Sequence, residues 1–477
     1  MERVIGRIKE LQEFRRLTDT GASEFIAVYG RRRVGKTFLI REAFQNKFDF
    51  YLTGMANAPL SQQLANFHFA IKKNDPSGII TGPAGNWLTA FHQLSRLLEE
   101  VKNKKKIIFL DEMPWLDTAQ SGFIQALEYF WNSWASVRKD VLLIVCGSAA
   151  SWMLNKLIHN KGGLYNRVTH RMKLEPFTLN ECEQYFKSRS GVYDRYQLIQ
   201  LYMVMGGIPF YLKQVNTGLS ATQNINRLCF DSGGILFDEF DTLYRSLFNN
   251  ADRHISIIEA LSKKSKGLTR EELIACTGLP SGGNTTNILK ELDESGFIRK
   301  YASYGKKGKD SLYQLTDFYS LFYLKFIKQE DRLDENHWLN GLDSAKQRSW
   351  AGYAFEQVCL AHLQSIKRAL GISGVQTAVS SWTGKIHEKG AQIDLVIDRR
   401  DGVINLCEAK FSINPFTIDK KYADNLRKKV TAFRQQTRTR KATFLTMITT
   451  FGLNRNMHSV SVVQNDLTMN ALFAGND

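Results

Sequence analysis

The sequence predicts an α/β protein whose N-terminal part is a parallel sheet covered by helices on both faces. Three continuous apolar runs, at 25–29, 106–110 and 141–145, have the composition of buried strands. Stretches of helical period separate them, and strands buried on both faces alternate with helices in parallel sheets. A chain of 477 residues is too long for one hydrophobic core, so we expect several domains.

Composition and charge restrict the class of protein. The net charge of +17 favours a polyanionic partner, nucleic acid above all, although many basic proteins bind none. The six cysteines stand singly, so neither a zinc site nor a disulfide framework is expected. No apolar run reaches the roughly 18–20 residues of a membrane span, and no signal peptide is evident. We therefore expect a cytoplasmic protein that makes no membrane contact.

A phosphate-binding loop follows the first apolar run. Gly30, Gly35, Lys36 and Thr37 meet the spacing GxxxxGK[ST] between a predicted strand and a predicted helix. In this motif backbone N–H groups cradle phosphates, the lysine reaches the outer phosphates, and the threonine hydroxyl binds Mg²⁺. The N-terminus of the helix also attracts the anion. The sequence therefore predicts a P-loop NTPase that binds ATP with Mg²⁺ rather than a chance match.

The two other apolar runs end in polar residues that suit the same site. We expect Asp111 to hold Mg²⁺ through water and Glu112 to polarise the attacking water, with a merely polar strand end as the alternative. Ser148 lies where a polar sensor of the γ-phosphate is expected, although Gly-Ser often just ends a strand. Arg167 suits an arginine finger or sensor as well as it suits an ordinary salt-bridged surface position.

A segment from 251 to 316 has the layout of a winged helix-turn-helix. A helix is expected at 254–263, a second begins at Thr269 with Glu272 completing a capping box, and a third spans 284–295 before a basic hairpin. The module either contacts DNA or packs as a lid on the ATPase, and both interpretations stay open. The candidate DNA-contacting residues are Asn284, Thr285, Thr286, Asn287, Lys290, Lys306, Lys307 and Lys309.

The C-terminal part holds a second candidate site. Asp394 begins one apolar strand, and Glu408 and Lys410 lie on the next, where they share a face because strand side chains alternate. Asp394 and Glu408 can share a divalent metal, Mg²⁺ or alternatively Mn²⁺, through oxygen ligands. Lys410 can orient or help deprotonate the attacking water while the metal stabilises charge on a phosphate. Glu356, on the preceding predicted helix, either completes the acidic set or is solvated.

A basic helix is expected directly after this site. Beside a phosphodiester site it would hold a nucleic-acid backbone without sequence selectivity, whereas alone it would be a solvated charged face. Its basic residues and those just beyond it are Lys420, Lys421, Arg427, Lys428, Lys429, Arg434, Arg438, Arg440 and Lys441.

The N-terminal motifs, in this order, resemble those of the archaeal-type ATPases related to the STAND branch of the AAA+ class. Besides the loop, the FLDE strand and the CGS strand, the resemblance includes an N-terminal Gly6-Arg7 element and a GxP element ending at Pro209, followed by the winged helix. It implies that Gly6 and Arg7 lie against the adenine and that Pro209 approaches the nucleotide. No arginine finger can be assigned firmly, which argues against a ring-shaped motor.

The C-terminal motif resembles the PD-(D/E)xK nuclease fold, and in particular the DUF234 domain that often accompanies archaeal-type ATPases. The resemblance assigns nuclease roles to Glu356, Asp394, Glu408 and Lys410, with Ile393 in place of the proline of the motif. It implies a restriction-endonuclease-like α/β fold. The predicted domains are a P-loop ATPase core at 1–197, a helical lid at 198–250, a winged helix at 251–316, a helical linker at 317–349 and a nuclease-like domain at 350–477.

Three functions compete at this point. The leading hypothesis is an ATP-regulated, metal-dependent nuclease that acts on DNA, and the resemblance connects such fusions with genome defence or mobile-element maintenance. The alternative is a STAND-like ATPase switch or DNA-binding regulator whose nuclease-like domain binds without cutting. A remodeller of protein targets is a third, weaker hypothesis. DNA is the expected partner, and self-association on ATP binding stays open.

Overall fold

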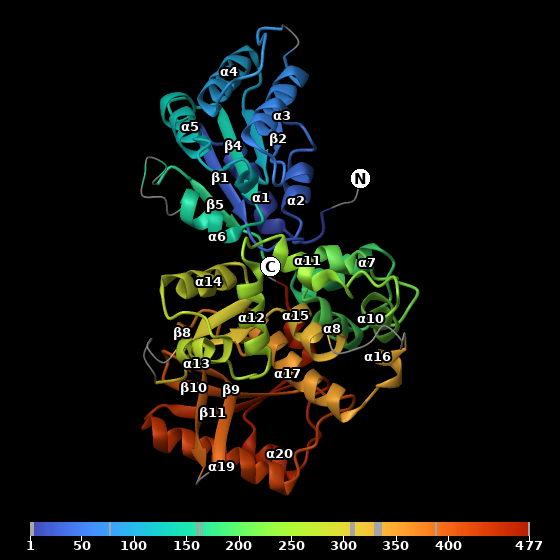
Figure 1. Cartoon of the computed structure of the whole chain (residues 1–477). Helices are drawn as coiled ribbons and strands as arrows, with labels where there is room; N and C mark the ends of the chain where they lie inside the picture. The colour runs from blue at the N-terminus through green and yellow to red at the C-terminus, as the bar shows by residue number, and fades with distance from the viewer. Residues whose placement is uncertain are drawn as a thin grey trace. The chain divides into compact units, whose positions relative to one another are not determined.

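The computed structural model describes residues 4–75, 78–158, 162, 164, 166–305, 311–328, 336–386 and 389–475. The chain divides into two compact units, Met1–Pro176 and Phe177–Asp477, and each is described by itself (Figure 1). Among the described residues, no helix combines the length and the apolar character needed to cross a lipid bilayer.

The first unit is built on a five-stranded parallel sheet, as the sequence predicted. In sheet order its strands are β2 (Phe50–Thr53), β3 (Lys106–Asp111), β4 (Val141–Gly147), β1 (Glu24–Tyr29) and β5 (His170–Lys173). The three predicted strands occupy the centre, where residues are buried on both faces. The two edge strands have four residues each and were not predicted, because β2 is short and β5 is mostly polar.

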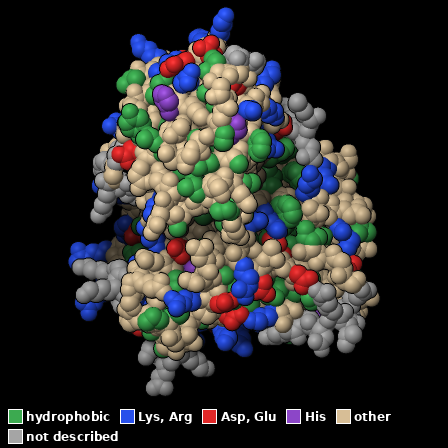
Figure 2. Space-filling model, turned by 45° about the horizontal axis from the view of Figure 1, so that its top comes forward, with side chains coloured by type: hydrophobic (Ala, Val, Ile, Leu, Met, Phe, Trp, Pro, Cys, Tyr) green, Lys and Arg blue, Asp and Glu red, His purple; other side chains and the backbone are tan. Residues whose placement is uncertain are grey.

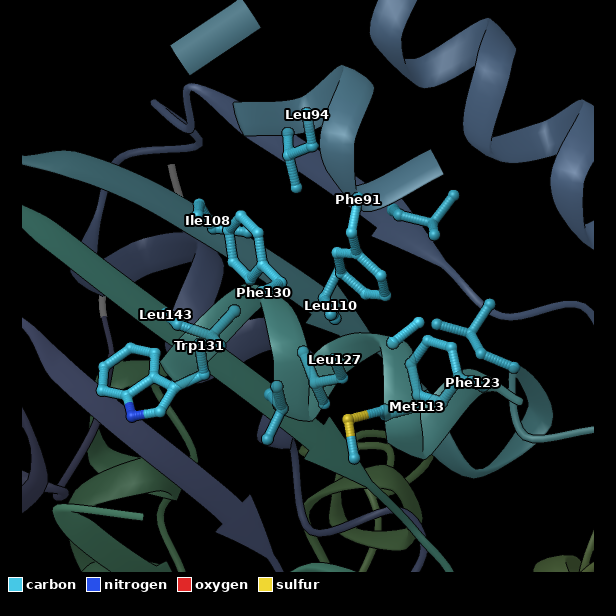
Figure 3. Packing of buried hydrophobic residues seen from close by; sticks show 14 of the residues in the cluster. Phe91, Leu94, Ile108, Leu110, Met113, Phe123, Leu127, Phe130, Trp131 and Leu143 are labelled. Carbon is cyan, nitrogen blue, oxygen red and sulfur yellow. The ribbon is translucent and has the colours of Figure 1, made fainter. Parts of the chain in front are cut away.

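Helices cover both faces of this sheet. On one face α3 (Leu60–Lys73), α4 (Trp87–Glu100) and α5 (Phe123–Phe130) enclose the larger core. Figure 3 shows part of it, with Phe91 and Phe130 of the helices against Ile108 of β3. On the other face, α1 (Ile8–Thr18) and α2 (Lys36–Ala43) pack with a second aromatic group, and the rings of Phe14 and Phe44 lie 5.5 Å apart. Burial of each such ring stabilises the fold by about 1.5–3 kcal/mol.

Strand order determines where a ligand can bind. β4 lies between β1 and β3, with Tyr29 opposite Gly147 and Leu110 opposite Val145. The carboxyl ends of these three parallel strands therefore meet at one edge of the sheet. Open α/β sheets bind ligands at this edge, so the residues that follow the three strands share a site.

The second unit begins with helices. They are α7 (Leu179–Ser188), α8 (Arg195–Met205), α9 (Pro209–Leu212), α10 (Ala221–Cys229) and α11 (Glu239–Arg245). The segment expected to be a winged helix-turn-helix follows with α12 (Ala251–Ser262), α13 (Arg270–Thr277), α14 (Gly283–Glu294) and the antiparallel pair β6 (Ile298–Tyr301) and β7 (Leu312–Leu315). The predicted capping box is present, because Thr269 and Glu272 each accept a hydrogen bond from the other's backbone N–H.

Four helices lead into the C-terminal sheet: α15 (Phe318–Phe322), α16 (His337–Asn340), α17 (Ala345–Ala361) and α18 (Leu363–Ala369). α17 and α18 are separate helices, since the helical path is interrupted at His362. The His362 ring is buried, and its Nε2 accepts a hydrogen bond from Leu179 N at 2.9 Å. Burial lowers the pKa of His362 to about 4, so the ring stays neutral and accepts this bond.

The C-terminal sheet is mixed and has five strands in the order β12-β11-β10-β9-β8. The strands are β8 (Thr377–Ile386), β9 (Lys389–Arg399), β10 (Val403–Lys410), β11 (Ala442–Thr449) and β12 (Asn465–Thr468). β8, β9 and β10 are antiparallel, whereas β10, β11 and β12 are parallel. The crossover helices are α19 (Lys420–Thr437) and α20 (Met457–Val462). Leu426 and Phe433 of α19 are buried in the core of this sheet.

Candidate functional sites

The first site is the loop between β1 and α2. Gly30 has a φ of 143°, and a Cβ there would lie 2.3 Å from Leu174 O, so only glycine fits. Gly35, at a φ of 88°, caps α2. Lys36 is 5% exposed, and its Nζ donates hydrogen bonds to Gly30 O at 3.1 Å and to Arg31 O at 3.0 Å. The ammonium group of the loop therefore folds back over the loop itself.

Asp111 is the centre of the polar contacts beside this loop. Its Oδ1 accepts hydrogen bonds from Thr37 Oγ1 at 3.0 Å and from Cys146 Sγ at 2.7 Å, and Tyr51 OH donates to its Oδ2 at 3.3 Å. The hydroxyl and the carboxylate predicted to serve Mg²⁺ are thus adjacent. Burial lowers the pKa of Lys36, while the charges of Glu112 and Asp111 act in the opposite direction. Tyr51 and Cys146 were not predicted as members of this site.

Glu112 and Ser148 are in direct contact. Ser148 donates two hydrogen bonds to the Glu112 carboxylate, from Oγ at 2.8 Å and from N at 3.2 Å. Glu112 has a left-handed backbone with φ 46°, which is uncommon for a residue other than glycine and occurs often at functional sites. The residue predicted to polarise water is therefore held at the end of β4 by the residue predicted to sense phosphate. Both roles stay predictions.

The other residues predicted to contact the nucleotide occupy different places. Gly6 and Arg7 are both left-handed and precede α1, and Arg7 donates to Glu175 O at 2.7 Å, which ties the start of α1 to the segment after β5. Arg167 is exposed in a turn before β5. Pro209 belongs to the second unit, where it is the first residue of α9.

The second site lies where β9 and β10 separate. Their pairing ends at Leu395 and Cys407, one residue before Asp394 and Glu408 come opposite one another. Glu408 is 2% exposed. α17 packs against β10. Glu356 on this helix interacts electrostatically with Asp394, Lys410 and Glu408. The structure therefore brings together the four residues that the sequence singled out.

Two carboxyl groups of this site, those of Glu356 and Asp394, have raised pKa values. Burial and the charge of Asp394 raise the pKa of Glu356 to about 8, while burial and Glu408 raise that of Asp394 to about 7. Lys410 and Lys429 oppose both shifts. Neighbouring buried carboxyls disfavour each other's charge, and such altered values are concentrated at functional sites.

Lys429 of α19 is a member of this site that the sequence interpretation had placed on a basic surface. Its Nζ lies 2.6 Å from Glu408 Oε1, and its side chain is 18% exposed. The nearby Tyr422 ring lies 5.5 Å from Lys410 Nζ. The sequence did contain a pattern that could have placed Lys429 at this site. The inner face of α19 is formed by residues that recur at helical spacing, namely Tyr422, Leu426, Lys429 and Phe433.

The fit of a metal to the second site is incomplete. Asp394 and Glu408 offer the oxygen donors that Mg²⁺ prefers. One Glu408 oxygen is bound by Lys429, however, and the described part of the chain holds no group of three or more His, Cys, Asp or Glu side chains suited to a metal ion. Metal binding at Asp394 and Glu408 therefore stays a prediction.

The expected winged helix offers only some of its predicted DNA-contacting residues. Asn284, Thr286, Asn287 and Lys290 are exposed on α14. Thr285 is 1% exposed, and its hydroxyl donates to Pro280 O at 2.7 Å, so its prediction as a DNA contact was wrong. The lysines of the expected wing, Lys306, Lys307 and Lys309, lie outside the described residues.

The segment after β6 is bound to the C-terminal sheet. Tyr304 N donates to Ser381 O of β8 at 2.7 Å, and Tyr304 OH donates to Asp398 Oδ2 of β9 at 3.2 Å. From β7, Gln314 Nε2 reaches Tyr353 OH at 3.3 Å, one turn before Glu356 on α17. This hairpin therefore packs against the domain that carries the second site.

Surface charge is dispersed on the face shown in Figure 2, where Lys and Arg side chains alternate with Asp and Glu side chains. The net charge of +17 therefore does not form a single basic patch on that face. Within α19 the exposed basic residues are Lys420, Lys421, Arg427, Lys428 and Arg434.

Comparison with known families gives a match that includes the first site. Residues 5–215 match the family described as an ATPase domain predominantly from Archaea. This span contains the loop from Gly30 to Thr37, Asp111 and Ser148. Residues 5–215 form an archaeal-type ATPase domain. The match ends well before Glu356.

Related proteins extend over more of the chain. An uncharacterized protein of Methanocaldococcus jannaschii is 24% identical over 395 residues, which are 82% of this chain and 83% of the relative. The Walker-type ATPase of Pyrococcus abyssi is similar in structure, at 16% identity and a TM-score of 0.48 over 68% of this chain and 96% of that one. The ORC2 protein of Aeropyrum pernix is similar at 14% identity and a TM-score of 0.40 over 73% and 96% of the two chains. Both TM-scores are below 0.5, so the ATPase assignment depends on the family match and the site.

Proposed function

We propose that the chain is an ATP-hydrolysing protein that controls a metal-dependent DNA nuclease in its C-terminal domain. The observation that carries the nuclease half is the convergence of Glu356, Asp394, Glu408 and Lys410 where β9 and β10 separate. Three carboxyl groups and a lysine, carried by two neighbouring strands and one helix, are the kinds of group that metal-dependent phosphodiester hydrolysis uses.

In the ATPase half, the backbone N–H groups from Gly30 to Thr37 hold the phosphates, and Lys36 neutralises the outer ones. The Lys36 ammonium already lies at the loop, bonded to two of its carbonyl groups. Thr37 and Asp111, whose oxygens lie 3.0 Å apart, suit Mg²⁺. The Glu112 carboxylate orients the attacking water once its hydrogen bonds with Ser148 are broken. The proposal also includes nucleotide contacts by Gly6, Arg7, Arg167 and Pro209. It further includes switching of the kind seen in STAND ATPases.

In the nuclease half, a divalent ion supplies stabilisation of negative charge when bound. Asp394 and Glu408 hold it, Lys410 orients the water, and Glu356 can accept a proton near neutral pH, given its raised pKa of about 8. The exposed basic residues of α19 hold the DNA backbone, which makes no demand on sequence. The expected winged helix adds contacts through the exposed residues of α14.

A switch that binds DNA without cutting is the second candidate function. The ion pair between Lys429 and Glu408 favours it, because the ammonium occupies a carboxylate oxygen that a metal would use. In that case ATP binding controls DNA affinity, and the acidic site contributes only to the folded structure.

A cleavage assay separates the two functions. Linear, circular and single-stranded DNA are incubated with the protein and Mg²⁺ or Mn²⁺, with and without ATP. We expect cleavage by the wild type and a loss of at least about a hundredfold in Asp394→Asn. Asp401→Asn is the matched control, because Asp401 lies in the turn between the same two strands and is paired with Arg399. No cleavage of any substrate with either metal would refute the nuclease function and leave the switch as the candidate.

A further inference from the structure

The inner face of α19 brings two polar side chains to the second site. Tyr422 and Lys429 are two helical turns apart, on the face whose other members, Leu426 and Phe433, are buried in the core of the C-terminal sheet. Lys429 reaches Glu408 at 2.6 Å, and Tyr422 stacks under Lys410 Nζ at 5.5 Å. A helix following the two strands therefore completes the surroundings of Glu408 and Lys410.

The Tyr422 hydroxyl is a buried donor. Its oxygen is shielded from solvent and has no hydrogen-bond partner among the residues that the structure describes. The ring packs edge-to-face with the Phe416 ring, and the two ring centroids lie 5.4 Å apart. Burial and the charges of Glu408 and Asp394 raise the pKa of the hydroxyl, so it keeps its proton. Buried polar groups in proteins nearly always have a partner, so a missing one points to a ligand.

We propose that Lys410, Tyr422 and Lys429 form a subsite for a backbone phosphate of the nucleic acid, a proposal that rests on the proposed nuclease function. Phosphate oxygens accept several charge-assisted hydrogen bonds, and two ammonium groups with a hydroxyl supply suitable donors. An ammonium group has three donors, so Lys429 can bind Glu408 and a phosphate oxygen together. Lys429 thereby fixes the substrate relative to the carboxylates.

The subsite differs in kind from the exposed face of α19. Solvated lysines contribute salt-dependent affinity through counterion release, and each contributes to a similar degree. The three donors of the subsite are partly or largely buried, and one of them is uncharged, so its removal leaves the net charge unchanged. Tyr422→Phe therefore removes a phosphate contact without altering the electrostatic attraction between the protein and DNA.

The test measures DNA binding in EDTA, where cleavage does not occur. A fluorescein-labelled 20-base-pair duplex is titrated with wild type, Tyr422→Phe and Lys429→Met, and binding is followed by fluorescence anisotropy. We expect each variant to bind about tenfold more weakly, as for loss of a hydrogen bond to a charged group. Inorganic phosphate should displace the duplex from the wild type only at concentrations far above that of the duplex. The reason is that the subsite binds one phosphate of a nucleic-acid backbone, not a free phosphate ion.

Two controls match these changes. Lys264→Met removes a lysine whose ion pair with Glu272 has the same length of 2.6 Å, and Tyr193→Phe removes a hydroxyl that donates to Leu219 O. Both controls should bind like the wild type, and Tyr422→Phe should keep the wild-type melting temperature because its hydroxyl has no partner among the described residues. Lys429→Met should melt lower, because it leaves the buried Glu408 carboxylate without its ion-pair partner, and its binding is compared at a temperature where it is folded. Equal losses in Lys264→Met and Lys429→Met, or unchanged binding by Tyr422→Phe, would overturn the proposal.

Cleavage is assayed separately on the same preparations with Mg²⁺. A wild type that binds in EDTA with the expected variant losses but never cuts refutes the nuclease function and keeps the phosphate subsite. A wild type that cuts, together with a Tyr422→Phe protein of wild-type affinity and rate, refutes the subsite and keeps the nuclease function.

Discussion

At the scale of single residues, Asp111 shows how distant parts of the chain complete a short motif. Thr37 and Asp111 belong to patterns visible in the sequence, but Tyr51 joins Asp111 from 60 residues away and Cys146 from 35 residues away. No local spacing indicates such contacts. Sequence motifs therefore predict the candidate nucleotide-binding residues, and tertiary structure supplies the side chains that contact them.

The contact of Tyr51 leads to a kinetic prediction. Tyr51→Phe removes the hydrogen bond to Asp111 Oδ2 and leaves the ring in place. We expect kcat for ATP hydrolysis to fall roughly fivefold with little change in KM, because one hydrogen bond orienting the carboxylate is lost. Steady-state ATPase kinetics measure this, with Tyr129→Phe, an exposed tyrosine of the same unit, as control. A raised KM at unchanged kcat would contradict the orienting role.

The carboxyl groups of the second site make stability depend on pH. The pKa of Asp394 is raised to about 7 and that of Glu356 to about 8, whereas unfolded carboxyls ionise near pH 4. Between these values the folded state holds more protons than the unfolded state, so stability falls as pH rises from about 4 to 8. In EDTA at pH 8, Asp394→Asn should melt about 3 °C above the wild type. At pH 4 the two should melt together.

The control for this pH dependence is Asp401→Asn. Arg399 lowers the pKa of Asp401, so the melting temperature of this variant at pH 8 should not exceed that of the wild type. Scanning calorimetry at the two pH values measures both effects. If the melting temperature of Asp394→Asn exceeds that of the wild type by as much at pH 4 as at pH 8, then packing, and not ionisation, explains the difference.

At the scale of elements, burial determined which strands could be predicted. The three central strands β1, β3 and β4 are continuous apolar runs because both of their faces are covered. The edge strands β2 and β5 are short, and β8 contains Ser, Thr and Gly residues that hide its period. Lys429 was misplaced because it stands among the many basic residues of α19, although Leu426 and Phe433 recur at its helical spacing and mark the inner face.

The turn from β1 to α2 predicts a local effect on stability. A Cβ at Gly30 would lie 2.3 Å from Leu174 O, and φ is 143°. Gly30→Ala should destabilise the first unit by roughly 1–3 kcal/mol and weaken ATP binding, because the backbone has to shift. Denaturant unfolding and nucleotide titration measure the two effects. Gly21→Ala, with nothing within 4 Å of the added methyl, should be neutral. Equal losses of stability and of ATP affinity in both variants would show that the close approach of the added Cβ to Leu174 O is not the cause.

At the scale of the whole chain, an archaeal-type ATPase domain is combined with a C-terminal mixed sheet that carries its own acidic site. The ATPase function was predictable because its phosphate loop is one continuous motif. The second candidate site was harder to predict, since its residues come from α17, β9, β10 and α19 and only the structure shows which lysine contacts Glu408. ATP hydrolysis and DNA cleavage should therefore be separable by mutation.

Parallel assays of ATP hydrolysis and DNA cleavage on the same protein preparations test the central claim most directly. We predict that Lys36→Ala abolishes ATP hydrolysis and makes cleavage insensitive to ATP. Asp394→Asn should abolish Mg²⁺- or Mn²⁺-dependent cleavage and leave ATP hydrolysis at the wild-type rate. DNA cleavage by Asp394→Asn at the wild-type rate would contradict the account.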